Sequence, residues 1–157
     1  MFAKSRVFVR WIAVSSLFSL VACGQPFLLL PGGKLDGVTE PAPGDWKIAD
    51  DVSTIQLETR PLDPYSVNIW VLGMGPFLYV HAGANRSTWV EHIEDDPNVR
   101  VRIEDQIYEL RATRVESQDE FNQFSDGYEA KYGTRPRVED ASEAYLFRLE
   151  ARTGASH

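Results

Sequence analysis

Cysteine is almost absent from this chain of 157 residues, since Cys23 is the single one. A lone cysteine has no partner, so disulfides within the chain are excluded. Histidine is also scarce, with three residues, and no His-Glu-x-x-His or comparable ligand spacing occurs. The Gly-x-Gly-x-x-Gly fingerprint and the Gly-x-Ser-x-Gly elbow are missing as well. We therefore expect no metal site, no Rossmann-type nucleotide site and no hydrolase built on that elbow.

Basic residues are outnumbered by acidic ones. The chain has 16 Lys and Arg against 23 Asp and Glu, a net charge of −7. A nucleic acid partner requires a basic face, so we expect no nucleic acid binding. Anionic lipid headgroups would also repel an acidic chain, so membrane attachment would have to rest on an acyl chain.

An apolar stretch near the N-terminus, Trp11–Ala22, is too short for a spanning helix, which needs about 20 apolar residues. Three basic residues precede it, namely Lys4, Arg6 and Arg10. A basic start, an apolar middle and a small-residue end are typical of an export signal. The end of the stretch, Leu20–Cys23, resembles the lipobox of bacterial lipoproteins, in which the new N-terminal cysteine carries the lipid.

This resemblance implies that residues 1–22 are a lipoprotein signal peptide and that Cys23 is the lipidation site. The protein would then be exported and lipid-anchored to the cell membrane of a bacterial envelope. An ordinary secretory signal followed by a cysteine by chance is the alternative. The leader holds three basic and no acidic residues, so the remaining 135 residues carry 13 basic against 23 acidic side chains, a net charge of −10. That length suffices for one domain with its own core.

Two further segments follow the leader. Residues 23–51 are rich in proline, glycine and acidic residues and are interpreted as a tether and N-terminal arm. Phe27–Leu30 and Trp46 are too apolar for a fully solvated linker, so part of this arm should pack on the domain. Residues 52–152 are expected to form that domain.

Alternation of apolar and polar residues, with turn residues between the segments, predicts six strands. They are Thr54–Thr59, Ser66–Leu72, Phe77–Ala82, Asn98–Glu104, Ile107–Val115 and a last strand through Tyr145, Phe147 and Leu149.

Two Ser/Thr-x-x-Glu capping boxes, Thr88–Glu91 and Ser117–Glu120, predict two helices. The first helix should run to about Asp95, and Gly133 should close the second. The second helix carries an apolar stripe that we interpret as its core face, made of Phe121, Phe124, Tyr128 and Tyr132.

The predicted order is β-β-β-α-β-β-α-β, which is a mainly β chain with two helices, in the α+β class. Short connections between consecutive strands favour antiparallel pairing. Six strands of this size are expected to curl into a small barrel, because closure removes exposed edges.

The region of the first helix resembles the split β-barrel flavin-binding proteins of the pyridoxamine-phosphate-oxidase-like superfamily. The nearest members are the deazaflavin-dependent nitroreductase group, whose pattern is W-x-x-N-L-x-x-N-P-x-V-x-V. The matching residues are Trp89-x-x-His92-Ile93-x-x-Asp96-Pro97-x-Val99-x-Val101, then Tyr108-x-x-x-Ala112-x-x-Val115 and Phe147-x-Leu149. His92 and Asp96 stand where that group has asparagine, which leaves the fold in place and changes groups near the cofactor.

The resemblance implies a six-stranded antiparallel split β-barrel that forms a homodimer and binds FMN or a deazaflavin between its subunits. It implies a membrane-anchored oxidoreductase-like protein that reduces a small oxidised substrate. No catalytic side chain is assigned. The cofactor-binding residues that it implies are Arg60, His81, Asn85, Arg86, Ser87, Thr88 and Trp89.

The loop at Asn85–Thr88 is also the best candidate on physical grounds. It enters a helix, where free backbone N–H groups and the helix dipole favour an anion such as a phosphate. Arg86 would add a positive charge, and the hydroxyls of Ser87 and Thr88 would add donors. The alternative is ordinary helix capping beside a solvated Arg86.

The other candidates have plain structural alternatives too. Arg60 could cover a strand end, Trp89 could be a core residue, and His81 could be a polar residue at the end of a strand. The alternative for the whole chain is a non-enzymatic split-barrel lipoprotein that binds a small ligand or an envelope partner. The exchanges at His92 and Asp96 and the predicted export favour this second hypothesis.

Overall fold

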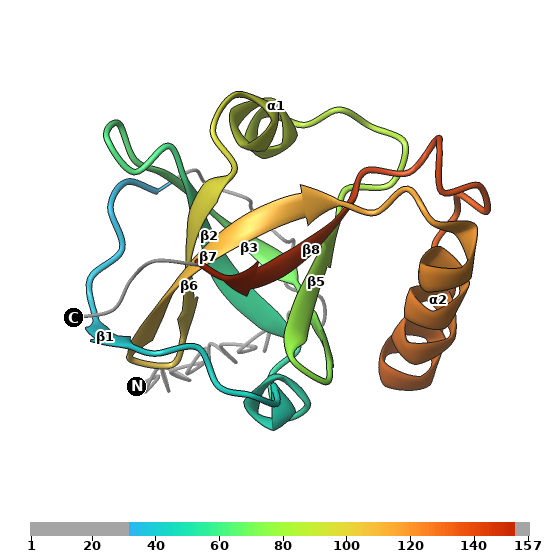
Figure 1. Ribbon diagram of the computed structural model, residues 1–157, viewed down its shortest axis with the longest axis horizontal. Coiled ribbons are helices and arrows are strands. Elements are labelled where there is room, and N and C mark those ends of the chain that lie inside the picture. The colour runs from blue at the N-terminus through green and yellow to red at the C-terminus, as the bar shows by residue number, and fades with distance from the viewer. Residues whose placement is uncertain (1–31, 153–157) are drawn as a thin grey trace, which may run out of the picture.

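The computed structural model of the chain describes residues 32–152 (Figure 1). The predicted signal peptide (residues 1–22), the lipidation site Cys23 and the first part of the predicted tether lie outside the described residues. The division of the chain at residues 22 and 51 therefore stays a prediction. Within residues 32–152, no helix has the length and apolar character needed to cross a bilayer.

Eight strands form one sheet that curls into a half-barrel (Figure 1). They are β1 (Val38–Glu40), β2 (Thr54–Thr59), β3 (Tyr65–Trp70), β4 (Leu72–Met74), β5 (Phe77–His81), β6 (Asn98–Ile103), β7 (Gln106–Arg114) and β8 (Leu146–Ala151). The helices are a short 3-10 helix η1 (Lys47–Ala49), α1 (Thr88–Asp95) and α2 (Gln118–Tyr132). The order across the sheet is β3-β2-β6-β7-β8-β5-β4, and β1 pairs with β7.

The predicted fold class is confirmed, because the sheet is antiparallel at every pairing except that of β1 with β7. The strand count of six is wrong by two. One reason is β1, which lies in the arm, where no alternation of apolar and polar residues predicted a strand. The other is a break at Val71, which divides the predicted strand Ser66–Leu72 into β3 and β4. The main-chain N–H and C=O of Val71 are bound by Tyr132 and Lys131 of α2 instead of a neighbouring strand.

The barrel interior is filled by the inward side of the alternating strands. In β6, Val99, Val101 and Ile103 are at most 1% exposed, and the intervening arginines face outward. Helix α1 lies across one end of the barrel and adds Trp89 and Ile93 to this core (Figure 1). Each fully buried side chain of this kind stabilises the fold by roughly 1.5–3 kcal/mol.

A second apolar cluster lies between the sheet and α2, which stands beside β5 and β8 (Figure 1). Phe121 and Phe124 of α2 pack there against Leu146 and Tyr79. The start of α2 is capped as predicted, since the Ser117 hydroxyl accepts from the Glu120 N–H at 3.4 Å. Gly133 ends the helix with φ +71°, the left-handed conformation that suits glycine.

The arm crosses the outer face of the sheet. Gly32 exchanges two main-chain hydrogen bonds with Ser66 of β3, at 2.8 and 2.9 Å. Leu35 then lies over β2 and β6, where it is 5% exposed. Beyond it the chain joins β7 as β1. A Cβ at Gly37 would lie 2.7 Å from the Asp105 carbonyl oxygen, so only glycine fits this close approach.

A buried ion pair holds the arm at its centre. Glu58 of β2 is 1% exposed, and the Arg100 guanidinium donates to its two oxygens at 2.9 and 3.0 Å. The same two side chains bind both main-chain groups of Leu35: Glu58 accepts from its N–H at 2.5 Å, and Arg100 donates to its C=O at 3.2 Å. Glu58 and Arg100 together, called here the arm clasp, thus recognise an extended chain through its backbone.

Candidate cofactor site at the start of α1

The loop that joins β5 to α1 is fixed at its first residues and free at its last. Main-chain hydrogen bonds of 2.9 Å join Ala82 N–H to the Tyr145 carbonyl and Tyr145 N–H to the Gly83 carbonyl. Gly83 has φ +67°, and a Cβ there would meet nothing within 4 Å. This glycine is therefore required by the backbone conformation and not by a close neighbour. The next three residues, Ala84, Asn85 and Arg86, are exposed.

Helix α1 begins without a side-chain cap. Ser87 is its N-cap residue in an extended conformation, and its side chain forms no capping hydrogen bond. The capping box predicted for Thr88 and Glu91 is therefore not formed. The Ser87 Oγ is buried and has no hydrogen-bond partner within residues 32–152. Because the first N–H groups of a helix have no partner inside the helix, an anion could bind here through the backbone and the Ser87 hydroxyl.

Arg86, which precedes α1, forms an ion pair with Glu94 of that helix. Its Nε donates to Glu94 Oε2 at 3.0 Å, and its Nη2 approaches the same oxygen. This hydrogen bond and the charge of Glu94 raise the pKa of Arg86. A second arginine, Arg114 of β7, lies 3.9 Å from the other Glu94 oxygen. Exposed ion pairs of this kind contribute little to stability, so the Arg86 guanidinium can exchange Glu94 for a phosphate at small cost.

Trp89 is a core residue. It is 7% exposed, and its ring meets the edge of Phe147 with ring centres 5.7 Å apart. It belongs to the apolar cluster of the barrel. The structure thus places Trp89 directly behind the loop, where it supports α1 from inside.

Arg60 lies beside the second turn of α1 and not at its start. It has φ +51°, and its guanidinium is paired with Asp63 at 3.1 Å. Burial and the charge of Arg60 both lower the pKa of His92 on α1. The Arg60 Nε is buried and has no hydrogen-bond partner in the described part of the chain. No hydrogen bond or ion pair in residues 32–152 joins Arg60 to the loop.

His81, the last residue of β5, faces α2. Its ring centre lies 5.7 Å from that of Phe124 and 6.3 Å from that of Tyr128. Burial lowers the pKa of His81 to about 4, so the ring is neutral near pH 7. Its Nε2 is buried with no partner among the described residues. His81 therefore offers no positive charge to a phosphate and is directed to another side of the sheet.

The two residues that replace asparagines of the nitroreductase pattern have structural partners. His92 Nδ1 and Thr59 Oγ1 are hydrogen bonded at 3.0 Å, and the Tyr65 ring packs edge-on against the imidazole. Asp96 accepts from the main-chain and side-chain nitrogens of Asn98, at 3.0 and 2.8 Å. His92 thus ties α1 to β2 and β3, and Asp96 fixes the turn from α1 into β6.

Of the seven predicted site residues, Asn85, Arg86, Ser87 and Thr88 lie together at the start of α1, where Ser87 is half-buried and the other three are exposed. Glu94 and Arg114 complete this group and were missed. The helical repeat carried a signal for Glu94, because a spacing of seven residues places it on the same face of the helix as Ser87. Arg114 carried none, since it comes from a distant strand.

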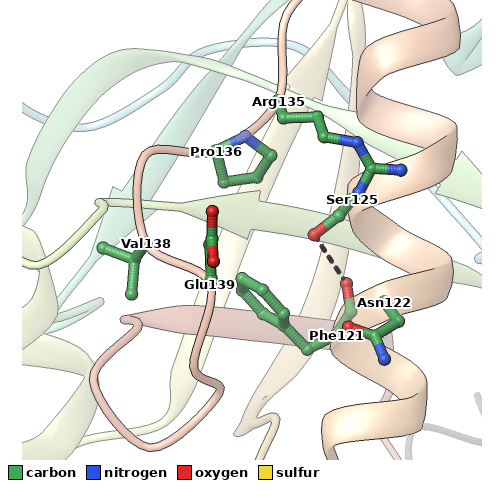
Figure 2. Close-up of a pocket in the computed structure, with 7 residues that line it drawn as sticks. All are labelled: Phe121, Asn122, Ser125, Arg135, Pro136, Val138 and Glu139. Carbon is green, nitrogen blue, oxygen red and sulfur yellow. Dashed lines mark hydrogen bonds between the residues drawn. The ribbon is translucent and has the colours of Figure 1, made fainter.

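A hollow of about 300 Å³ lies elsewhere, between α2 and the segment that follows it (Figure 2). Several of its polar groups already have partners within the chain. Ser125 donates to the Phe121 carbonyl at 2.9 Å, and Arg135 pairs with Glu129 and Asp126. None of its lining residues belongs to the loop or to α1.

No protein-family model and no curated protein matches this sequence. Several solved structures are similar to this chain in fold. A candidate pyridoxamine 5′-phosphate oxidase from Listeria innocua has a TM-score of 0.53 and 16% identity, over 66% of this chain and 87% of that one. A candidate 5-nitroimidazole antibiotic resistance protein from Bacteroides thetaiotaomicron has a TM-score of 0.52 and 14% identity, over 66% and 75%. A FAD-binding protein from Mesorhizobium loti has a TM-score of 0.50 and 14% identity, over 69% and 87%.

These likenesses concern the fold. The chain has the split β-barrel fold of the pyridoxamine-phosphate-oxidase-like flavin-binding proteins, as the motif around α1 predicted. Function has to be argued from the site, because one fold serves several activities.

Proposed function

We propose that this chain binds a flavin-type cofactor, FMN or a deazaflavin, and serves as an oxidoreductase for a small oxidised substrate. The observation that carries the proposal is the start of α1, which within residues 32–152 has no side-chain cap and leaves the buried Ser87 hydroxyl without a hydrogen-bond partner. That start lies in a split barrel, and one protein with a similar fold is a FAD-binding protein.

The loop residues fit a phosphate group. The free N–H groups at the start of α1 and the hydroxyls of Ser87 and Thr88 would donate to its oxygens. Arg86 would turn from Glu94 to the phosphate and supply the positive charge. Asn85, exposed beside them, adds an amide. Trp89 would keep α1 fixed while the exchange takes place.

The bound cofactor would supply the hydride or electron transfer. The chain's own task is then to hold and orient it, and the loop residues do this through the phosphate alone. His81 and Arg60 would act at most on other parts of the ligand, since no side-chain hydrogen bond or ion pair within residues 32–152 joins either of them to the loop. We further propose that the protein is a homodimer and that a lipid on Cys23 anchors it to the cell membrane.

The test is cofactor uptake by the full chain in detergent, followed by visible absorbance and by equilibrium titration. We expect FMN or a deazaflavin to bind, and Arg86→Ala to weaken binding roughly tenfold or more, as the loss of a charge-assisted hydrogen bond implies. Arg135→Ala is the matched control, because Arg135 is an exposed, acid-paired arginine on another surface. A colourless protein that takes up neither cofactor contradicts the proposal.

A non-enzymatic role is the second candidate, and one observation favours it. The charge of Arg86 is already paired with that of Glu94, so this guanidinium does not need an anionic ligand. In that case the barrel would present a surface to a small ligand or an envelope partner. This role is supported over the first if neither cofactor binds and if Arg86→Ala leaves the measured binding properties of the protein unchanged.

A further inference from the structure

A second surface of the molecule also carries the features of a binding site. It is a shallow hollow of about 380 Å³ on the outer side of the sheet, over β3, β2 and β6. The cross-strand register places Gln56 of β2 opposite Asn68 of β3 and opposite Arg102 of β6. Five of its six lining residues are polar; the set is Thr54, Ile55, Gln56, Asn68, Arg102 and Glu104.

Several polar groups of this hollow lack partners within residues 32–152. The Gln56 Oε1 is buried and forms no hydrogen bond. A buried polar atom without a partner is uncommon and calls for a water or a ligand. Arg102 donates one hydrogen bond, at 3.3 Å to the Asp36 carbonyl of the arm, and keeps its other donors free. This hydrogen bond links Arg102 of the hollow to the arm.

The charges of the hollow cancel. Arg102 carries one positive charge and Glu104 one negative charge, and the other lining side chains are neutral. A phosphate or another strong anion would therefore gain little here, in contrast to the start of α1. The planar amide, guanidinium and carboxylate groups each present pairs of donors or acceptors. Such pairs match the adjacent hydroxyl groups of a sugar ring.

An exposed aromatic ring adjoins the hollow. Trp70 pairs with Thr54 across the strands and lies on the same face of β3 as Asn68. It is 39% exposed, although its ring stacks on Tyr132 with centres 4.6 Å apart and an angle of 7°. The stacking holds the ring in place, so little side-chain entropy is left to lose on binding. A fixed, amphipathic ring is a suitable platform for the C–H face of a pyranose.

We propose that this outer face binds a neutral pyranose sugar. The C–H face of the sugar lies against Trp70, and its hydroxyls bind Asn68, Gln56 and Arg102. Glu104 accepts from a further hydroxyl. The open shape of the hollow suits a residue within a longer glycan as well as a free sugar. This site is separate from the loop at α1 and does not depend on cofactor binding.

The test is titration of the full chain in detergent with cellotetraose, maltotetraose and tetra-N-acetylchitotetraose, followed by calorimetry and by tryptophan fluorescence. We expect at least one of them to bind and to change the fluorescence of the exposed Trp70. A change that is lost in Trp70→Ala excludes Trp11, Trp46 and Trp89 as its source. Asn68→Ala should weaken binding about threefold to tenfold, the loss expected for one hydrogen bond. Trp70→Ala should weaken it more.

Gln123→Ala, which removes an exposed amide on α2, is the control and should bind as the parent does. Asn68 is exposed and forms no side-chain hydrogen bond in the described chain. We therefore expect Asn68→Ala to keep the fold even in the case that Trp70→Ala does not. Absence of binding by all three sugars up to about 10 mM, a limit that would still reveal millimolar affinity, overturns the proposal. Binding that is unchanged in Asn68→Ala and in folded Trp70→Ala also overturns it.

Discussion

The Tyr132 hydroxyl of α2 lies within hydrogen-bonding distance of both main-chain groups of Val71. It accepts from the Val71 N–H at 3.1 Å and donates to the Val71 carbonyl at 2.6 Å. Lys131 donates to the same carbonyl at 2.8 Å. Helix α2 thus replaces a strand neighbour at the point where β3 ends and β4 begins. Burial raises the pKa of Tyr132, so its hydroxyl stays protonated near neutral pH.

Tyr132→Phe should therefore destabilise the protein. The substitution leaves the Val71 N–H without an acceptor, and an unpaired buried group costs about 1–3 kcal/mol. Chemical denaturation, followed by far-UV circular dichroism, measures the free energy of unfolding. Tyr128→Phe is the control, because the Tyr128 hydroxyl forms no hydrogen bond within residues 32–152 although its ring packs on Tyr132. Equal losses of unfolding free energy in the two variants would contradict a stabilising role of the hydrogen bonds made by the Tyr132 hydroxyl.

The arm clasp yields a second prediction. Glu58→Gln leaves the partly buried charge of Arg100 without its counter-ion, and breaking a buried ion pair in this way costs roughly 3–5 kcal/mol. Hydrogen exchange should also become faster at Leu35, whose N–H is bound by Glu58. The double variant Glu58→Gln, Arg100→Gln should recover part of the stability, because no charge is then left unpaired. A double variant that loses the sum of the single losses would contradict this account.

The pH dependence of stability should carry a contribution from His81. Its pKa is lowered by burial to about 4, whereas the unfolded chain has the ordinary value near 6.5. Below pH 6.5 the unfolded state binds a proton at His81 that the folded state does not bind. This contribution to stability is therefore complete above pH 6.5 and falls as the pH is lowered toward 4. His81→Phe should flatten the stability curve between these values. Parallel curves for the parent and the variant, measured by denaturation at several pH values, would rule this out.

A fourth prediction concerns Glu94 and rests on the proposed cofactor site. Glu94→Gln removes the competitor for Arg86, so the affinity for FMN or a deazaflavin should rise roughly threefold to tenfold. Glu91→Gln makes the same change of charge at an exposed position of α1 that has no ion pair among the described residues. An equal gain in both variants would mean that general charge, and not the release of Arg86, sets the affinity.

Sequence reasoning succeeded where local pattern decides structure. The alternation in β6 predicted which of its side chains are buried, and Gly133 marked the end of α2. The motif at Trp89 predicted the split barrel from the sequence alone. In each case the signal lies in neighbouring residues that share one element.

It failed where distant segments meet. The break at Val71 depends on two side chains of α2, which lie some sixty residues later in the chain. Glu58 looks like a solvated residue on the outer side of β2 until the arm covers it. The ring of His81 packs against α2 and the guanidinium of Arg60 pairs with Asp63, so residues that the resemblance grouped into one site are spread over several surfaces.

The arm clasp has a mechanical consequence. Within the described chain, the arm is fastened to the barrel at Ser66, at the Glu58–Arg100 pair and along β7. A load that enters at Gly32 is thereby spread over four strands, β3, β2, β6 and β7, instead of separating one strand from the sheet edge. If a lipid holds the N-terminus, forces at the membrane act on the arm and its attachments and leave the packing of the barrel interior undisturbed.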